Sequence, residues 1–202
     1  LMYGMEAMSG AVAPLADNEK FTGILTMFSN PILGLLAGTI LTAVIQSSSA
    51  SVGILQALCA TGAVNFSTAL PIIMGQNIGT CVTAIISSIG TSKNAKRAAA
   101  VHLFFNISGT VIFMVVFYTL NAFVHFSFLN TAASPAGIAV IHSLFNIGAT
   151  ILLFPFANLL EKMAILAIPD KGSEVEEMEE EKINPDLARL DERFLDKPGF
   201  AM

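Results

Sequence analysis

The sequence predicts an all-α integral membrane protein, and composition and charge distribution support this prediction. Of the 202 residues, 54% are hydrophobic and 12% are charged, which is about half the charged fraction of a typical soluble domain. No Asp, Glu, Lys or Arg occurs from Phe21 to Ser92 or from Ala98 to Leu160. Because a charge at the bilayer centre is costly, these windows are typical of helices embedded in a lipid bilayer.

The net charge of −5 arises in the C-terminal tail, where six of the eight residues 174–181 are Glu. We expect this run to be a solvated acidic linker. The chain has no basic cluster of the kind that binds nucleic acid, so nucleic acid is excluded as a partner. Cys59 and Cys81 lie in apolar segments and are expected to be buried free thiols.

The N-terminal part predicts two short helices. Residues 1–13 are expected to form a short or truncated helix. Residues 21–28 place apolar side chains at i, i+3, i+4 and i+7, which is typical of an amphipathic helix. At this length we expect that helix to lie in the membrane interface.

A polar tip interrupts the next apolar segment. Asn30 and Pro31 form a helix start signal. The 15 residues from Pro31 to Ile45 span only about 22 Å of helix. The hydrocarbon core is about 30 Å thick, and the polar stretch "QSSSAS" comes next. Two short arms meeting at a polar tip predict a re-entrant hairpin over residues 31–61. The alternative is a single span from about 35 to 58 whose serines bond to backbone carbonyls.

A second interrupted element is expected over residues 67–90. Gly75 and Gly79 flank Gln76 and Asn77, and we expect the helix to break there, because irregular backbone at membrane depth is tolerated against protein or water. Small residues recur every four positions, however, so the alternative is a continuous helix with a small-residue packing face.

Two ordinary spans follow, near 98–120 and 138–160, and they resemble each other. "VHLFFNISGTVIF" at 101–113 matches "IHSLFNIGATILL" at 141–153. Each has a polar stripe on one face, interpreted as interhelical hydrogen-bonding residues rather than ligands. The stripes are His102, Asn106 and Thr110, and His142, Asn146 and Thr150.

Orientation follows from the positive-inside rule. The loop 91–97 contains three basic residues, whereas the loop 121–137 contains none. We therefore place loop 91–97 and the C-terminal tail in the cytoplasm, with the hairpin opening outside. The expected location is the cytoplasmic membrane, crossed several times.

The polar tip predicts binding of an anion together with cations. The second arm begins near Ser49, and a helix N-terminus favours anions. The amides of Gln46 and Asn77 can donate and accept hydrogen bonds, and free carbonyls of broken helices can ligate Na⁺. Such helices near the midplane are typical of secondary transporters.

Coupling to sodium is favoured over coupling to protons. The core has no Lys or Arg to neutralise a bound anion, so co-bound cations would have to do so. Without Asp or Glu in the core, proton coupling could use only His102, His125 and His142.

Two motifs together resemble the type II sodium–phosphate cotransporter family. They are "QSSSASVG" at 46–53 and "ALPIIMGQNIGT" at 69–80, and the two His-x-x-Phe-Asn helices are similar to its bacterial branch. The resemblance implies sodium-coupled phosphate transport by two inverted repeats, of which this chain would be the second. It also implies that residues 169–202 lead into a PhoU-like helical domain. The missing partner would be the first repeat or a second copy of the chain.

The resemblance further implies the site residues, because matching positions exist in both motifs. The implied phosphate and sodium site comprises Gln46, Ser47, Ser48, Ser49, Asn77, Gly79 and Thr80, with Ser48, Ser49, Asn77 and Thr80 as sodium ligands. Na⁺ is the coupling ion, and no other cofactor is expected.

Other function classes fit the residues less well. An intramembrane serine protease needs one activated serine with a base, such as Ser48 with His102 or His142. A row of equivalent serines is instead typical of a ligand cradle, so no enzyme is expected. The remaining alternative is a channel or a phosphate-sensing signalling partner, which would lack saturable sodium-dependent uptake.

Overall fold

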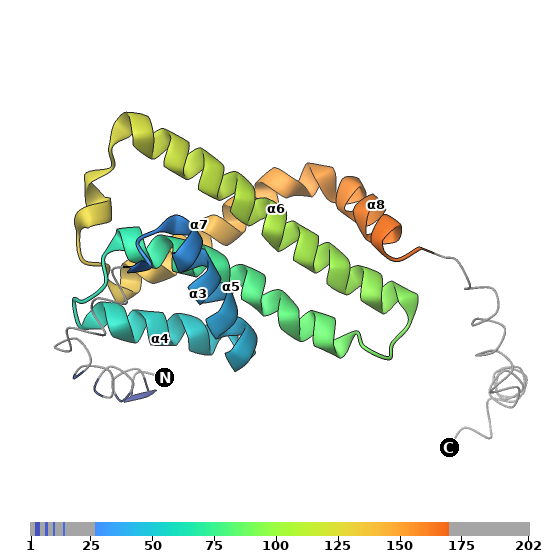
Figure 1. Ribbon diagram of the computed structural model, residues 1–202, viewed down its shortest axis with the longest axis horizontal. Coiled ribbons are helices and arrows are strands. Elements are labelled where there is room, and N and C mark those ends of the chain that lie inside the picture. Colours follow the sequence, from blue (N-terminus) through green and yellow to red (C-terminus); the bar gives the residue numbers. More distant parts are fainter. Residues whose placement is uncertain (1–2, 5–6, 8–9, 11–13, 15–26, 170–202) are drawn as a thin grey trace, which may run out of the picture. The chain divides into compact units, whose positions relative to one another are not determined.

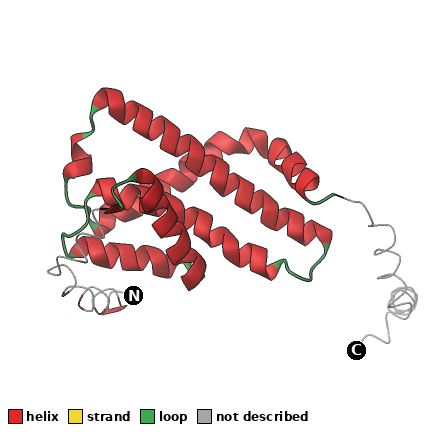
Figure 2. Ribbon diagram, viewed as in Figure 1, coloured by secondary structure: helices red, strands yellow, loops and turns green. Residues whose placement is uncertain are grey.

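The computed structural model describes residues 3, 4, 7, 10, 14 and 27–169. The chain divides into two compact units, Leu1–Ala167 and Ile168–Met202, and helices α3 to α8 all belong to the first. In this described part the backbone is helical, with no strand beyond an isolated antiparallel bridge between Asn65 and Ala132, as Figure 2 shows. The all-α prediction is confirmed.

Within residues 27–169, six α-helices and two short 3₁₀ helices follow one another, and Figure 1 shows their arrangement. They are α3 (Pro31–Ile45), α4 (Ser48–Ala60), α5 (Phe66–Ser87), α6 (Lys93–Val124), η1 (Ser127–Asn130), α7 (Pro135–Leu153), η2 (Phe154–Phe156) and α8 (Ala157–Ala167).

Among the residues that the structure describes, three segments are long and apolar enough to cross a membrane: α5, α6 and the run Pro135–Ala167. In α5, 61% of the most apolar stretch is buried inside the chain, against 17% in α6 and 22% in Pro135–Ala167. Helix α5 is therefore the central helix, packed against α3, α4, α6 and α7. The other two segments turn most of their apolar surface outward, as helices in contact with lipid do.

Helix starts follow the capping signals of the sequence. Asn30 caps α3, its Oδ1 accepting the N–H groups of Ile32 at 3.0 Å and Leu33 at 3.4 Å, and Pro31 fills the first turn. Helix α7 begins with the same combination. The Oγ of Ser134 accepts the N–H of Gly137 at 3.0 Å, and Pro135 fills the first turn. The predicted start of α3 is confirmed.

Helices α3 and α5 run in the same direction and meet backbone to backbone. Gly34 lies beside Pro71 near one end of the contact, and Gly79 lies beside Thr42 near the other. Small residues allow this approach, since helix association in membranes depends on close van der Waals packing. The two helices make the most extensive contact in the described part of the fold.

The break expected in the 67–90 element is wrong, because α5 is one continuous helix from Phe66 to Ser87. At Gly75 an added Cβ would overlap the backbone carbonyl of Leu35, and at Gly38 it would overlap that of Ile72. The glycines therefore serve the contact with α3 rather than an unwound segment. The alternative of a small-residue packing face is the one the structure has.

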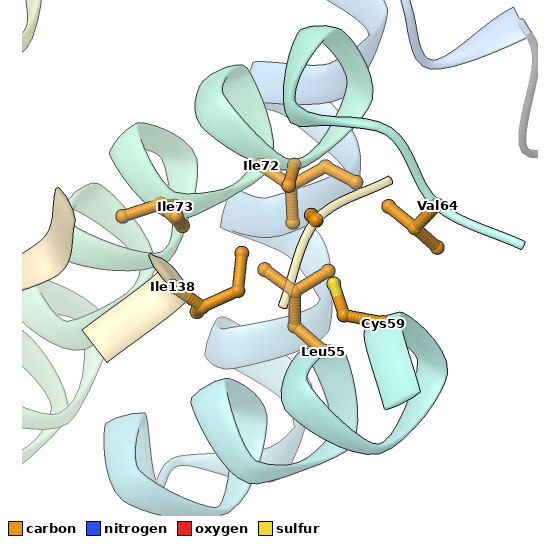
Figure 3. Packing of buried hydrophobic residues seen from close by; sticks show 8 residues of the cluster. Leu55, Cys59, Val64, Ile72, Ile73 and Ile138 are labelled. Carbon is orange, nitrogen blue, oxygen red and sulfur yellow. The ribbon is translucent and has the colours of Figure 1, made fainter. Parts of the chain in front are cut away.

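Helix α4 packs against α5 in the opposite direction. A buried apolar cluster joins α4, α5 and α7 through residues that converge in Figure 3: Leu55, Cys59, Val64, Ile72, Ile73 and Ile138. The end of α4 thus lies near the start of α5, while its start lies farther along α5, where Ser51 contacts Gln76. Burial of this cluster holds the second arm in place.

The two arms α3 and α4 are separate helices joined at Gln46 and Ser47, so the alternative of one continuous helix over 35–58 is wrong. An apolar pocket of about 590 Å³ lies between the two arms, beyond the turn that joins them. Leu36 on α3 and Ile54 on α4 are among its lining residues. Re-entry of this pair into the membrane from one side stays a prediction.

Some expectations concern residues outside those described. They are most of the helix at 1–13, the interfacial helix at 21–28 apart from its end, and the acidic linker with the PhoU-like entrance beyond residue 169. These expectations stay predictions.

Candidate functional site

The polar tip is a two-residue turn between α3 and α4. Helix α3 ends at Ile45, and its C-cap Gln46 adopts a left-handed backbone conformation with φ of 57° and donates its N–H to the carbonyl of Thr42 at 2.7 Å. Ser47 is extended, with φ of −142°, and α4 begins at Ser48. Left-handed backbone is uncommon for residues other than glycine, so Gln46 marks a sharp, specified reversal of the chain.

The serines of the tip leave much of their hydrogen-bonding capacity open. Ser47 caps α4, its Oγ accepting the N–H of Ala50 at 3.3 Å, and its Oγ lies 3.5 Å from that of Ser49. Gln46 and Ser49 are exposed, whereas Ser47 and Ser48 are half-buried. The tip therefore presents hydroxyl and amide groups at the positive end of the α4 dipole.

The predicted residues on α5 lie in three different surroundings. Asn77 is buried and donates its Nδ2 to the carbonyl of Ile73 at 3.0 Å. Gly79 faces α3. Thr80 is half-buried and donates its Oγ1 to the carbonyl of Gln76 at 2.9 Å. All three follow one another on α5, but Gly79 serves helix packing, so Asn77 and Thr80 are the α5 side chains with ligand chemistry.

A buried hydrogen-bond junction links the tip to α5 one turn deeper. The Oγ1 of Thr42 on α3 donates to the Oγ of Ser51 on α4 at 2.7 Å. The Nε2 of Gln76 on α5 donates to the same Oγ at 2.9 Å and to the carbonyl of Ser51 at 3.0 Å. All three side chains are at most 1% exposed.

The sequence motifs did not assign these three junction residues to the site. A signal existed, because each is a polar residue inside an otherwise apolar helix, where polar groups require partners. The motif pattern alone could not show that Ser51 turns inward while Ser49 turns outward.

The two polar stripes differ in their surroundings. Thr110 is buried and donates its Oγ1 to the carbonyl of Met74 on α5 at 3.4 Å, and the Sγ of Cys81 donates to the carbonyl of His102 at 3.5 Å. These bonds agree with interhelical hydrogen bonding by the first stripe.

In the second stripe, Asn146 and Thr150 each form a hydrogen bond within α7. Asn146 donates to the carbonyl of His142 at 2.8 Å, and Thr150 donates to that of Asn146 at 2.8 Å. Thr150 is exposed. The interhelical role expected of the second stripe therefore stays a prediction, since Thr150 bonds within its own helix among the described residues.

The polar groups of the site are neutral hydroxyl and amide groups. Hydroxyl and amide oxygens are ligands suited to hard cations, and the N–H groups at a helix start suit an anion. From Phe21 to Ser92 the chain has no charged side chain, so α3, α4 and α5 offer a ligand dipoles and neutral polar groups.

Comparison with known proteins identifies the family. The model of the Na+/Pi-cotransporter family matches residues 1–134. The chain is a member of the Na+/Pi-cotransporter family. No solved structure matches it significantly.

This Na+/Pi-cotransporter family member is similar to bacterial and animal proteins. It is 34% identical over 138 residues to the uncharacterized protein YqeW of Bacillus subtilis, covering 68% of this chain and 44% of that protein. It is 37% identical over 97 residues to human sodium-dependent phosphate transport protein 2B, covering 45% of this chain and 14% of that protein. It is 42% identical over 86 residues to rat sodium-dependent phosphate transport protein 2A, covering 40% and 14%. The chain thus spans less than half the length of each of these relatives.

Proposed function

We propose that this chain forms one half of a transporter that couples inorganic phosphate movement to sodium across the cytoplasmic membrane. Membership of the family supports this function, as do relatives named sodium-dependent phosphate transport proteins. The observation that carries the proposal is the turn at Gln46 and Ser47, which brings open hydroxyl groups to the start of α4. The chain acts as a transporter and not as an enzyme.

Phosphate binds at the start of α4 in this proposal. The hydroxyl groups of Ser47, Ser48 and Ser49 can donate to phosphate oxygens, and the N–H groups of the first helical turn supply positive potential. Gln46 contributes an exposed amide beside them. Bound sodium ions neutralise the phosphate, since no basic side chain lies between Phe21 and Ser92.

Sodium is held by neutral oxygens of the two motifs. We assign Ser48 and Ser49 on α4, and Asn77 and Thr80 on α5, as its ligands, with Gly79 allowing α5 to approach α3. The missing side of the site comes from a first repeat or from a second copy of the chain. The open, half-exposed tip supports this, because a transported anion needs a surrounding shell of donors.

Orientation completes the proposal. The basic residues of loop 91–97 place that loop and the C-terminal tail in the cytoplasm. The arms α3 and α4 then open to the outside, with the tip at membrane depth.

Sodium-dependent uptake tests the function. The full-length protein in vesicles should accumulate phosphate saturably under an inward sodium gradient, and uptake should collapse when K⁺ or choline replaces Na⁺. Equal uptake driven by a pH gradient without sodium would contradict sodium coupling. Flux that never saturates would instead indicate a channel, and an absence of any flux would favour a phosphate-sensing role.

A further inference from the structure

Gln76 stands outside the residues assigned to the site, yet it makes the hydrogen bonds that join the serine-bearing arm to α5. Its Nε2 donates to the carbonyl of Ser51 at 3.0 Å and to the Oγ of Ser51 at 2.9 Å. The same Oγ accepts from Thr42 on α3 at 2.7 Å. One side chain of α5 thus contacts α4 at a point that α3 also contacts.

The orientation of the Gln76 amide is fixed by its partner. The carbonyl of Ser51 can only accept a hydrogen bond, so the nitrogen of the amide must face it. The Oε1 then points the other way, and it is buried without a donor among the described residues. An unpartnered buried acceptor is destabilising by at least as much as a typical hydrogen bond is stabilising. Stability therefore gives little reason for an amide at this position.

The place of this contact in the fold explains the amide at position 76 better than stability does. Ser51 lies in the first turn of α4, four residues after Ser47, and a helix turn moves as a unit with its neighbours. Fixing both the carbonyl and the hydroxyl of Ser51 fixes the rotation and the height of that turn relative to α5. On α5 the next turn carries Thr80, whose Oγ1 donates to the carbonyl of Gln76 itself at 2.9 Å.

We propose that Gln76 is a positioning residue for substrate binding: it holds the serine tip in register with Asn77 and Thr80 on α5. The proposal rests on the proposed function for the identity of the substrate. Its geometric part, that Gln76 sets the position of the start of α4, stands on the hydrogen bonds alone.

Gln56 offers a matched control. It also lies on α4, and its Nε2 donates to the carbonyl of Pro135 at the start of α7 at 3.0 Å. It too ties α4 to another helix, but five residues farther from the tip than Ser51. Replacing each glutamine by Met removes an amide and keeps a side chain of similar length. The two variants therefore differ mainly in which part of α4 loses its hydrogen bonds to a neighbouring helix.

The first measurement is sodium-dependent phosphate uptake by the full-length protein. Gln76→Met should raise the KM for phosphate about five- to tenfold, the effect of losing one or two positioning hydrogen bonds, while the thermal midpoint stays close to that of Gln56→Met. The Gln56→Met variant should keep the KM of the unmodified protein. Equal KM changes in the two variants, or none in Gln76→Met, would overturn the proposal.

A second measurement separates this proposal from the proposed function. Spin labels at Ala50→Cys and Ile86→Cys, both exposed positions, report the distance between α4 and α5 after Cys59 and Cys81 are replaced by Ala. Gln76→Met should broaden the distance distribution, and Gln56→Met should not. An unchanged distribution in Gln76→Met would overturn the positioning role even if the protein transports phosphate. A broadened distribution without any uptake would refute only the proposed function.

A third variant guards against misfolding of Gln76→Met. Ser51→Ala removes one of the two acceptors of Gln76, the Oγ, from the other helix and leaves the backbone carbonyl, so it should broaden the same distribution, though less than Gln76→Met does. Because the two residues act through one contact, the double variant should raise the KM no more than the larger single change. Additive increases in KM would contradict a shared role.

Discussion

Two serines in the same motif have opposite surroundings, and substitution should separate them. Ser49 is exposed, and Ser51 is fully buried with hydrogen bonds from Thr42 and Gln76. We expect Ser49→Ala to weaken sodium-dependent phosphate binding about five- to 150-fold, as the loss of a donor to a charged ligand does, with an unchanged thermal midpoint.

The Ser51→Ala variant should lower the thermal midpoint, because the buried hydroxyl of Thr42 loses its acceptor and Gln76 loses one of its two, at a cost of about 1–3 kcal/mol. Phosphate titrations and thermal unfolding on the same full-length preparations measure both effects. A thermal midpoint lowered equally by the two substitutions would contradict this assignment.

Two threonines at equivalent positions of the internal repeat allow a similar comparison. Thr110→Val removes a bond from α6 to the carbonyl of Met74 on α5 and should cost about 0.6 kcal/mol, the average for membrane hydrogen bonds. Thr150→Val removes only a bond within α7 on an exposed face, and should leave the stability unchanged. Denaturant titration of both variants checks this, and phosphate affinity should stay normal in each.

The residue-level predictions from sequence succeeded where chemistry is local. Asn30 as a cap and the grouping of Gln46 with the serines follow from neighbouring residues. The inward turn of Ser51 and its bond to Gln76 depend on how α4 is rotated against α5, which no local pattern specifies. The motif therefore located the tip and missed the junction beneath it.

At the scale of helices, the α3–α5 contact depends on the absence of side chains at its closest points. Gly75→Ala would place a Cβ against the backbone carbonyl of Leu35, and backbone cannot move aside as a side chain can. We expect a cost of about 1–3 kcal/mol from overpacking. Gly109→Ala is the control, since its Cβ would lie 3.2 Å from the side chain of Ala149 and should cost less.

Thermal unfolding of the two glycine variants measures this difference. A larger loss of stability in Gly109→Ala would show that the α3–α5 contact relaxes easily. In that case the approach of the two backbones would not explain why glycine occupies position 75.

The same glycines explain why one element was predicted incorrectly. A glycine pair around Gln76 and Asn77 suits an unwound segment as well as a close helix contact, and both require small residues. The choice depends on whether another backbone lies alongside, and here α3 does. Helix α5 accordingly stays continuous, and its apolar composition reflects burial in protein rather than exposure to lipid.

At the scale of the whole unit, the arrangement of helices predicts the membrane topology. Asn65 and Ala132 are paired by a backbone bridge, so the start of α5 and the loop after α6 lie at one end. We expect single cysteines at Asn30, Asn65 and Asn130 to react with an impermeant reagent from outside, and one at Asn94 to react only from inside.

These four positions are exposed in the structure, so access is limited by the membrane and not by folding. Labelling of Asn30→Cys from inside, with Asn65→Cys labelled from outside, would mean that α3 and α4 cross the membrane once between them. The re-entrant hairpin would then be refuted, while the order of α5, α6 and α7 across the membrane would stand.

The uncharged stretch from Phe21 to Ser92 has an electrical consequence. A fixed charge carried through the full membrane potential contributes about 2.3 kcal/mol per 100 mV, and α3, α4 and α5 carry no such charge. In these helices voltage therefore acts on the bound ions and on helix dipoles alone. Currents recorded in voltage jumps without sodium or phosphate should not change when polar residues of this stretch are replaced by Ala, because none of these side chains carries a charge through the field.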